Sequence, residues 1–250
     1  MGNVVRRAAV ANNNNPIDRT FRVRFAQIDS AQVIYYPRYL EMVADTFPEA
    51  QMGAPPFDLS IRFMKPNRLG DDVRMRLTRQ SAGWSVSGHM TDEHFLISLV
   101  AADKQKLLAH EDAYSSSAIT VRNWMCGPSG RLHVSRYFEL ISHAIEQWFE
   151  SSLSLTFYEL HVRRGLGIPT VQLDTQCQGL PAAGDEIVMR LHPLSVGSSA
   201  LQLQSWLVCT ERVLLTSRQV IVFVKKSDNA IETVRIPGEL REQIQRQIES

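Results

Sequence analysis

The residues with the clearest potential for chemistry are an aspartate and the helix start that follows it. Asp29 stands seven residues before Tyr36, and Pro37 then opens a segment with apolar residues at helical spacing. A helix start presents unpaired N–H groups and the positive end of the helix dipole, and proline fits its first turn. A loop that carried Asp29 back over this helix end would place a carboxylate beside hydrogen-bond donors. Such a pair is suited to attack on a carbonyl group and to stabilisation of the resulting oxyanion.

The elements that must position Asp29 follow from the periodicity around it. A short strand is expected at residues 19–26, and a helix from about Pro37 to Phe47, with apolar side chains three and four residues apart. Several long strands without helical interruption should follow. One early helix and then an antiparallel run of strands predict an α+β unit whose sheet wraps around its helix.

The same order of segments occurs twice. Residues from Phe21 can be laid over residues from Ile119 at an offset of 98, which aligns Arg38, Tyr39 and Glu41 with Arg136, Tyr137 and Glu139. Farther on, the offset is 114, and Met-Arg-Leu at 75–77 then coincides with Met-Arg-Leu at 189–191. The offset grows by 16 residues between the two blocks (114 − 98), so the second copy should have a longer helical segment. The two blocks indicate an internal duplication.

The repeat predicts the following division of the chain. We expect a flexible N-terminal segment at 1–16, a first unit at 17–110, a linker at 111–117, a second unit at 118–235 and a C-terminal helix at 236–250. The sheets of the two units should join edge to edge, with both helices on the same side.

Composition excludes some partners. The 27 basic and 26 acidic residues balance, so no global charge indicates binding to nucleic acid or to an anionic membrane. No apolar stretch approaches the length that crosses a bilayer. The three cysteines Cys126, Cys177 and Cys209 cannot all pair and lack metal-ligand spacing. We therefore expect a cytoplasmic protein without a metal site.

The first copy resembles a known family. Its segment Asp29-Ser-Ala-Gln-Val-Ile-Tyr-Tyr-Pro-Arg-Tyr-Leu-Glu41 is similar to the motif of hotdog-fold thioesterases of the 4-hydroxybenzoyl-CoA thioesterase type. The specific part of the resemblance covers about Phe21–Glu41, and the order of elements extends it to both halves. It implies two fused hotdog units that hydrolyse an acyl-CoA thioester to the free acid and CoA. The implied partner is thus a small acyl-CoA molecule, with coenzyme A entering as part of the substrate and no separate cofactor.

The resemblance also implies roles for residues of the first copy. The Asp29 carboxylate attacks the thioester carbonyl or activates water, and the N–H of Tyr36 polarises the carbonyl oxygen. The expected pocket wall comprises Gln32, Tyr35, Tyr39, Phe138, Ile141 and Ile145. Cations near the second strand, Arg62, Lys65 and Arg68, are candidates for binding the CoA phosphates. Glu41 recurs as Glu139, so it is equally suited to being a catalytic residue and to being a structural partner for an arginine.

The sequence departs from the family motif at two positions. Gln32 stands where the family usually has glycine, and Gly127 stands in the second copy where the first has Asp29. We therefore expect one carboxylate-dependent site per chain, with the second unit supplying part of the pocket wall. Cys126 beside Gly127 is interpreted as a buried thiol rather than as a replacement nucleophile.

Other functions stay open at this point. Asp29 could be only a turn residue or a helix cap. The substrate could be an acyl-carrier-protein ester, or the protein could bind acyl-CoA without catalysis. By analogy with other hotdog proteins, two chains could associate as a homodimer.

Overall fold

The computed structural model describes residues 15–29, 32–48, 54–226 and 231–249. Most of the predicted flexible segment, residues 1–14, therefore lies outside the described part. The first unit consists of β1 (Ile17–Arg22), α1 (Arg38–Thr46), β2 (Phe57–Phe63), β3 (Asp72–Gln80), β4 (Gly83–His89) and β5 (Glu93–Ala101). None of the helices in the described ranges combines the length and apolarity that a membrane-spanning helix requires.

The second unit repeats this order with additions. It consists of β6 (Tyr114–Ser115), β7 (Ile119–Thr120), α2 (Val134–Leu153), β9 (Thr170–Cys177), β10 (Glu186–Val196), β11 (Ala200–Cys209) and β12 (Arg212–Val222). A π-helix at Glu159–Arg163 follows α2. Three short strands, β8 (Leu166–Gly167), β13 (Val224–Lys226) and β14 (Ile231–Thr233), form a small separate sheet. The terminal helix α3 (Gly238–Glu249) packs against β10 and α2.

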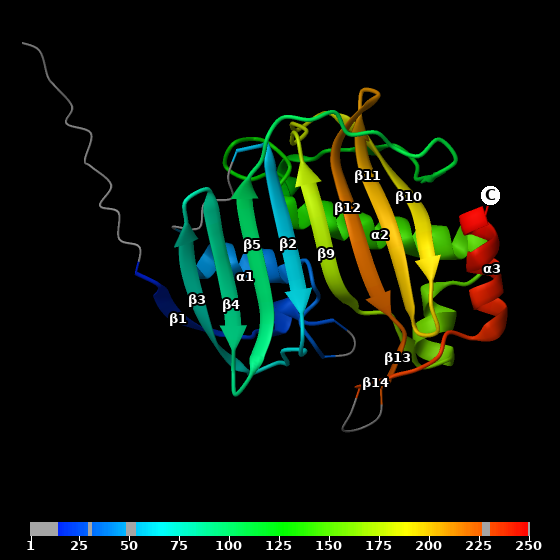
Figure 1. The fold of residues 1–250 in the computed structure, drawn as a ribbon, viewed down its shortest axis with the longest axis horizontal. Helices are drawn as coiled ribbons and strands as arrows, with labels where there is room; N and C mark the ends of the chain where they lie inside the picture. Colours follow the sequence, from blue (N-terminus) through cyan, green and yellow to red (C-terminus); the bar gives the residue numbers. More distant parts are fainter. Residues whose placement is uncertain (1–14, 30–31, 49–53, 227–230, 250) are drawn as a thin grey trace, which may run out of the picture.

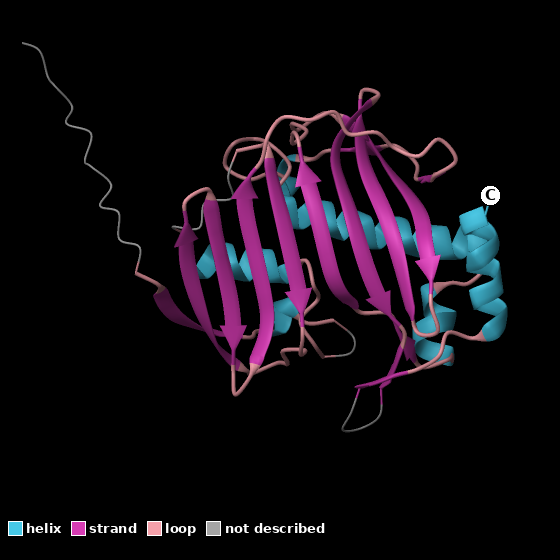
Figure 2. Ribbon diagram, in the orientation of Figure 1, coloured by secondary structure: helices cyan, strands magenta, loops and turns pink. Residues whose placement is uncertain are grey.

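The strands join into one antiparallel sheet with both long helices on the same side (Figure 1). The 11-stranded sheet has the order β1-β3-β4-β5-β2-β9-β12-β11-β10-β6, with β7 also paired to β10. The two units meet where β2 pairs with β9, and Figure 2 shows α1 and α2 behind this continuous surface. This architecture confirms the predicted fold class, two units that each wrap a sheet around a helix.

Two expectations about the elements can be compared with the structure. The helix of the second copy is longer, as the growing offset predicted: α2 has 20 residues and α1 has 9. The strands that open each unit are shorter than predicted, because each runs into a 3₁₀ turn, Phe25–Gln27 in the first copy and Asn123–Met125 in the second. In the first turn the Gln27 side chain accepts a hydrogen bond from the Arg24 N–H at 2.8 Å, and this bond bends the chain toward the motif loop.

A pseudo-two-fold axis relates the units. Ser60 and Asp174, which are equivalent at the offset of 114, face each other across the β2–β9 seam. Backbone hydrogen bonds repeat with the same offsets. The Ile34 N–H donates to the Asn67 carbonyl at 2.9 Å, and the equivalent Leu132 N–H donates to the Pro181 carbonyl at 2.8 Å. The duplication seen in the sequence is therefore a duplication of local structure.

Four charged side chains connect the helix starts across this axis. Arg38 binds Glu41 at 2.7 Å within α1 and Glu139 of α2 at 3.2 Å. The symmetric partner Arg136 binds Glu139 at 2.7 Å and Glu41 at 3.1 Å. Glu41 is thus a partner of arginines, one of the two roles that the sequence allowed. We refer to these four residues as the axial ion network.

The axial ion network should contribute more to stability than an exposed ion pair does. Its side chains are only 21–27% exposed, so water screens the charges less than at the surface. We expect Arg38→Ala to lower the free energy of unfolding by about 1–2 kcal/mol, between the values for surface and buried pairs. Urea denaturation followed by circular dichroism measures the change.

The matched control is Arg22→Ala. Arg22 pairs with Asp72 at 2.9 Å, but the two side chains are 59% and 56% exposed. This variant should lose about 0.5 kcal/mol or less. Equal losses in both variants would show that the axial ion network is no more than a surface feature.

Candidate active site

Asp29 begins a tight turn that ends at Val33. The turn is closed by the Asp29 N–H, which donates to the Val33 carbonyl at 2.9 Å, and by a bridge between Ile28 and Ile34. One Asp29 carboxylate oxygen accepts a long hydrogen bond, 3.4 Å, from the Val33 N–H. The Asp29 residue is nevertheless exposed. Asp29 therefore shapes its turn while presenting a carboxylate to the surface of the site.

The turn is held against the start of α1. The Tyr35 N–H donates to the Gln27 carbonyl at 2.9 Å, which folds the loop back on itself, and Pro37 is the N-cap of the helix. Within the described part of the chain, no hydrogen bond uses the Tyr36 N–H as donor. The sequence-predicted oxyanion donor is thus an unpaired N–H at the positive end of a helix.

The position of Gln32 explains why glycine suits this loop. Gln32 has a φ of 62°, and its equivalent in the second copy, Gly130, has a φ of 70°. This left-handed conformation is strained for a residue with a side chain and free of strain for glycine. The turn therefore keeps its backbone shape in this chain despite the substitution, and the exposed Gln32 stands three residues after Asp29.

The second copy keeps the turn but not the carboxylate. The Gly127 N–H donates to the Arg131 carbonyl at 2.8 Å, and Cys126 bridges Leu132. A Cβ at Gly127 would meet the His133 ring at 3.6 Å, an ordinary contact. Steric exclusion therefore does not explain the missing carboxylate. His133 instead caps α2, with Nδ1 accepting the Ser135 N–H at 3.3 Å, and burial lowers the pKa of its imidazole.

Two tyrosines of the first unit extend onto the helix of the second. The Tyr36 hydroxyl donates to the Phe138 carbonyl at 2.9 Å and accepts from the Ser142 hydroxyl at 2.9 Å. Its ring centroid lies 6.3 Å from that of Phe138. Tyr35 also lies beside Ser142, and burial raises the pKa values of both tyrosines. Ile141 and Ile145, farther along α2, are buried.

Tyr39 belongs to a different environment, a buried polar chain in the first unit. Its hydroxyl bonds to the Asn67 side-chain oxygen at 3.1 Å, and the Asn67 amide lies 2.9 Å from Nδ1 of His94. Asn67 is fully buried, and the Tyr39 ring packs against Phe63 and Phe95. Burial, reinforced by the charges of Asp71 and Asp29, raises the pKa of Tyr39. Tyr39 thus lies within electrostatic reach of the Asp29 turn from the core side.

The three predicted phosphate ligands lie in three different settings. Arg62 pairs with Asp174 at 2.9 Å across the seam between the units. Lys65 pairs with Asp92. Arg68 is exposed, and its backbone bridges Val33 in the Asp29 turn. Of the three residues, Arg68 is the one whose backbone pairs directly with the turn that contains Asp29.

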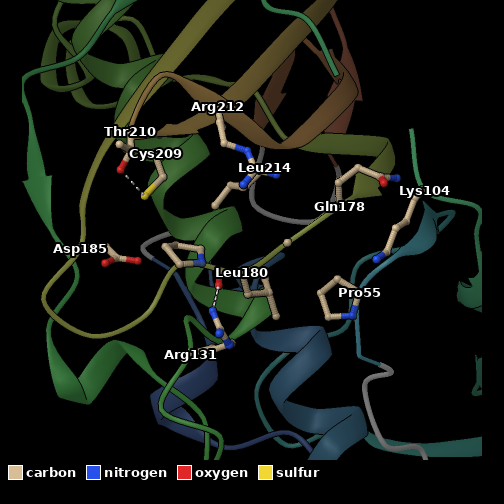
Figure 3. Close-up of a pocket in the computed structure, with 12 residues that line it drawn as sticks. Pro55, Lys104, Arg131, Gln178, Leu180, Asp185, Cys209, Thr210, Arg212 and Leu214 are labelled. Atoms are coloured by element: carbon tan, nitrogen blue, oxygen red, sulfur yellow. Dashed lines mark hydrogen bonds between the residues drawn. The ribbon is translucent and has the colours of Figure 1, made fainter. Parts of the chain in front are cut away.

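An open cleft of about 480 Å³ lies at the turn of the second copy (Figure 3). It gathers Lys104 of the first unit with Arg131 and Arg212 of the second, and Asp185 lies at its edge. The Arg131 guanidinium donates to the Leu180 carbonyl at 2.8 Å. The copy that lacks the carboxylate therefore retains a basic surface cleft.

Comparison with known proteins identifies this arrangement. Residues 121–244 match the family model of the Thioesterase-like superfamily. A solved structure from Lactobacillus plantarum, assigned as an oleoyl thioesterase, superposes with a TM-score of 0.62 at 10% identity, covering 84% of this chain and 97% of that one. The chain has the hotdog fold. No curated protein sequence gives a significant match.

A second solved structure is shorter and superposes on about half of the chain. An aspartate-to-asparagine mutant of 4-hydroxybenzoyl-CoA thioesterase, complexed with 4-hydroxybenzoyl-CoA, superposes with a TM-score of 0.50 at 13% identity. It covers 53% of this chain and 99% of its own. At these identities both likenesses concern the fold. The family match itself falls on the hotdog unit that lacks the motif aspartate.

Sequence reasoning missed several residues of this double hotdog. Asn67 and His94 carry the polar chain beneath Asp29, but neither belongs to a repeated or spaced motif. The axial ion network could have been predicted more fully, because both the arginine and the glutamate of its Arg-Tyr-x-Glu segment recur in the second copy. Polar residues on the inner face of β12, such as Ser217 and Gln219, were visible as breaks in an otherwise apolar alternation.

Burial of His94 should make stability depend on pH. Burial lowers the pKa of His94 from its ordinary value of 6.5, so the unfolded chain binds a proton more readily than the folded one. The free energy of unfolding should therefore decrease as pH falls below about 6.5 toward the lowered pKa. His94→Gln keeps an acceptor for Asn67 but removes this titration, and its slope of stability against pH should be smaller. Urea denaturation between pH 5 and 7 measures both slopes.

The control for this experiment is His143→Gln, which changes an exposed histidine on α2. Its slope should match that of the unmodified protein, in which the half-buried His133 also contributes. If His94→Gln and the unmodified protein had identical slopes, His94 would not be held neutral by the fold.

Proposed function

We propose that this protein is an acyl-CoA thioesterase with one carboxylate-dependent site per chain, at Asp29. The observation that carries the proposal is that one hydrogen-bonded loop carries both an exposed motif aspartate and, at the helix start, a Tyr36 N–H without a hydrogen-bond partner among the described residues. The match of the second half to the Thioesterase-like superfamily and the hotdog fold of the whole chain support the same chemistry. They do so independently of the motif, because the matched half is not the one that contains Asp29.

The reaction needs little beyond these two groups. In hydrolysis, the bond between the acyl carbon and sulfur breaks, and oxygen from water enters to give a carboxylic acid and the CoA thiol. Asp29 acts on the carbonyl carbon either directly or through a water molecule, and both routes require the same carboxylate in nearly the same place. The Tyr36 N–H stabilises the oxyanion that forms at the carbonyl oxygen. Tyr35 and Tyr36 line the site on the side where it meets α2.

The proposal assigns different parts to the two units. The first unit supplies the carboxylate and the oxyanion donor. The second unit supplies part of the pocket wall, beginning at Phe138. Gln32 lies at the edge of the Asp29 turn. Ile141 and Ile145 of α2 form the deeper part of the proposed pocket wall. Tyr39 supports the turn from beneath through its buried chain to Asn67.

The decisive experiment is Asp29→Asn. This change keeps the size of the side chain and an acceptor for the Val33 N–H, so the fold should be retained. We expect hydrolysis of acyl-CoA esters to fall by about 10²–10⁴-fold. Release of free thiol, followed with a chromogenic thiol reagent over a panel of CoA and carrier-protein esters, measures it and also separates the two classes of substrate.

The matched control is Asp112→Asn, an exposed aspartate in the segment between the units, which should leave turnover unchanged. Full activity in Asp29→Asn would place the catalytic carboxylate elsewhere. A large residual rate would contradict the single-site proposal, because it would have to arise at the second copy.

We also propose that Arg68 contributes to binding of the CoA phosphates, more than Arg62 and Lys65 do. The latter two are already engaged with Asp174 and Asp92, whereas the exposed Arg68 adjoins the Asp29 turn. Arg68→Glu should raise the KM for a CoA ester several-fold with little change in kcat, since a phosphate contact remote from the carbonyl acts on binding.

The control for the Arg68→Glu variant is a second substrate that lacks the CoA phosphates. An N-acetylcysteamine ester has the same thioester but no phosphates, and its kinetics should be equal in Arg68→Glu and the unmodified protein. An unaltered KM for the CoA ester would remove Arg68 from the proposal.

A further inference from the structure

The inner faces of the two half-sheets differ in chemistry at equivalent positions. Four buried residues on the inner face of the second unit are polar, Thr175, Ser205, Ser217 and Gln219, each 1–2% exposed. Their equivalents in the first unit are Ile61, Val86, Ile97 and Leu99, each 0–4% exposed. We call the four residues of the second unit the polar patch.

The strand registers establish this equivalence. In the first unit Ile97 pairs with Ile61 on one side and with Val86 on the other. In the second unit Ser217 pairs with Thr175 and with Ser205 in the same way. One cross-strand row is thus apolar in one unit and hydroxylated in the other.

Gln219 extends the polar patch along β12 into the next cross-strand row. It pairs with Leu173, as Leu99 pairs with Leu59 in the first unit. Since Leu59 and Leu173 are equivalent at the offset of 114, so are Leu99 and Gln219. The patch therefore occupies two adjacent rows on the inner face.

The polar patch is only partly satisfied by its own hydrogen bonds. Thr175 and Ser217 bond to each other at 2.6 Å, and the Gln219 amide donates to the Thr170 hydroxyl at 2.6 Å. The Ser205 hydroxyl and the Gln219 side-chain oxygen have no protein partner. Buried polar atoms in native proteins nearly always have a hydrogen-bond partner. The unpaired Ser205 and Gln219 oxygens therefore indicate that another molecule binds at the polar patch.

A tyrosine above the patch adds a third unpaired group. Tyr137 of α2 is fully buried, and its hydroxyl lies close to the hydroxyls of Ser217 and Ser205, but it has hydrogen-bond geometry with neither. In the first unit the equivalent Tyr39 hydroxyl bonds to Asn67. The residue equivalent to Asn67 is Pro181, which offers no side-chain partner. Tyr137 has therefore lost the partner that its counterpart keeps, while the sheet below it has become polar.

The polar patch is connected to the Asp29 site through Tyr36. The backbone N–H of Tyr36 belongs to that site, and its side chain reaches α2, where it meets Ser142 and lies near Gln219. The patch thus begins about one tyrosine side chain away from the donor that would hold the thioester carbonyl. An acyl group that enters alongside Tyr36 would point its far end at the patch.

We propose that the polar patch recognises the distal part of the acyl group and selects acyl chains that carry hydroxyl or keto oxygens remote from the thioester. This inference rests on the proposed thioesterase function at Asp29. Tyr137 and Ser205 can donate to such an oxygen, and the Gln219 side-chain oxygen can accept from a hydroxyl. A plain alkyl chain would leave all three groups buried and unpaired, which strongly disfavours its binding.

The test compares matched substrates in matched variants. The substrates are hexanoyl-CoA and ω-hydroxyhexanoyl-CoA, and the readout is the ratio of their kcat/KM values. We expect the unmodified protein to favour the hydroxylated ester by about tenfold or more. The variant Tyr137→Phe/Ser205→Ala/Gln219→Leu removes the three unpaired groups without adding bulk, and its ratio should fall to about one or below, with hexanoyl-CoA turnover retained.

A control and a smaller variant keep the result interpretable. Ile97→Val truncates the apolar counterpart of Ser217 in the first unit and should leave the ratio unchanged. If the triple variant does not fold, Tyr137→Phe alone still removes one donor and should lower the ratio several-fold.

Binding separates this inference from the proposed function. Non-hydrolysable thioether analogues of the two esters are titrated calorimetrically into the unmodified protein and the variant. If no ester is hydrolysed but the hydroxylated analogue binds more tightly and loses that advantage in the variant, the thioesterase proposal fails and the recognition proposal stands. Equal binding of both analogues, tighter binding of the alkyl one, or no binding would overturn it, and the patch would then hold buried water only.

Discussion

The pairing of β2 with β9 is the interaction on which the rest of the structure depends. It joins the two half-sheets into one surface and fixes the pseudo-two-fold axis through Ser60 and Asp174. Because each helix lies against its own half-sheet, this one register also sets how the two helix starts face each other. The axial ion network then links those starts directly. The reach of Tyr36 from the first unit onto α2 is a consequence of the same geometry.

Fusion of the two units frees each from the constraint of symmetry. In a dimer of identical chains, a substitution that alters one site alters its partner as well. Here the turn at Asp29 and the turn at Gly127 share a backbone hydrogen-bond pattern, but only the first carries the carboxylate that we propose to be catalytic. Likewise, Ile97 and Ser217 occupy equivalent positions, but one side chain is apolar and the other is a smaller hydroxyl group. The backbone has kept the symmetry, and the side chains have lost it.

The sequence predicted what depends on repetition and periodicity. Segments such as Arg38–Glu41 and Arg136–Glu139 revealed the duplication, and the helical spacing after Pro37 located α1 to within a residue at each end. The edge-to-edge joining of the sheets was predicted from the repeat and the family resemblance together. The link from Tyr39 through Asn67 to His94 could not be predicted, because it depends on side chains 28 and 27 residues apart meeting in the core. The ion pairs of Arg62 and Lys65 depend on tertiary neighbours in the same way.

The energetic cost of the polar patch must be met elsewhere in the second unit. Each buried polar atom without a partner costs about 1–3 kcal/mol, and replacing isoleucine by serine removes apolar burial as well. The second unit has a longer helix against its sheet: α2 buries eleven residues, including Trp148 and Phe149, whereas α1 buries four. The additional helix α3 closes the far end, with Leu240 and Ile244 in the core. These apolar side chains belong to α2 and α3 rather than to the polar rows of the sheet, and their burial stabilises the second unit. The first unit has a shorter helix and an apolar inner face, which accords with our proposal that it contributes the reacting groups rather than the recognition surface.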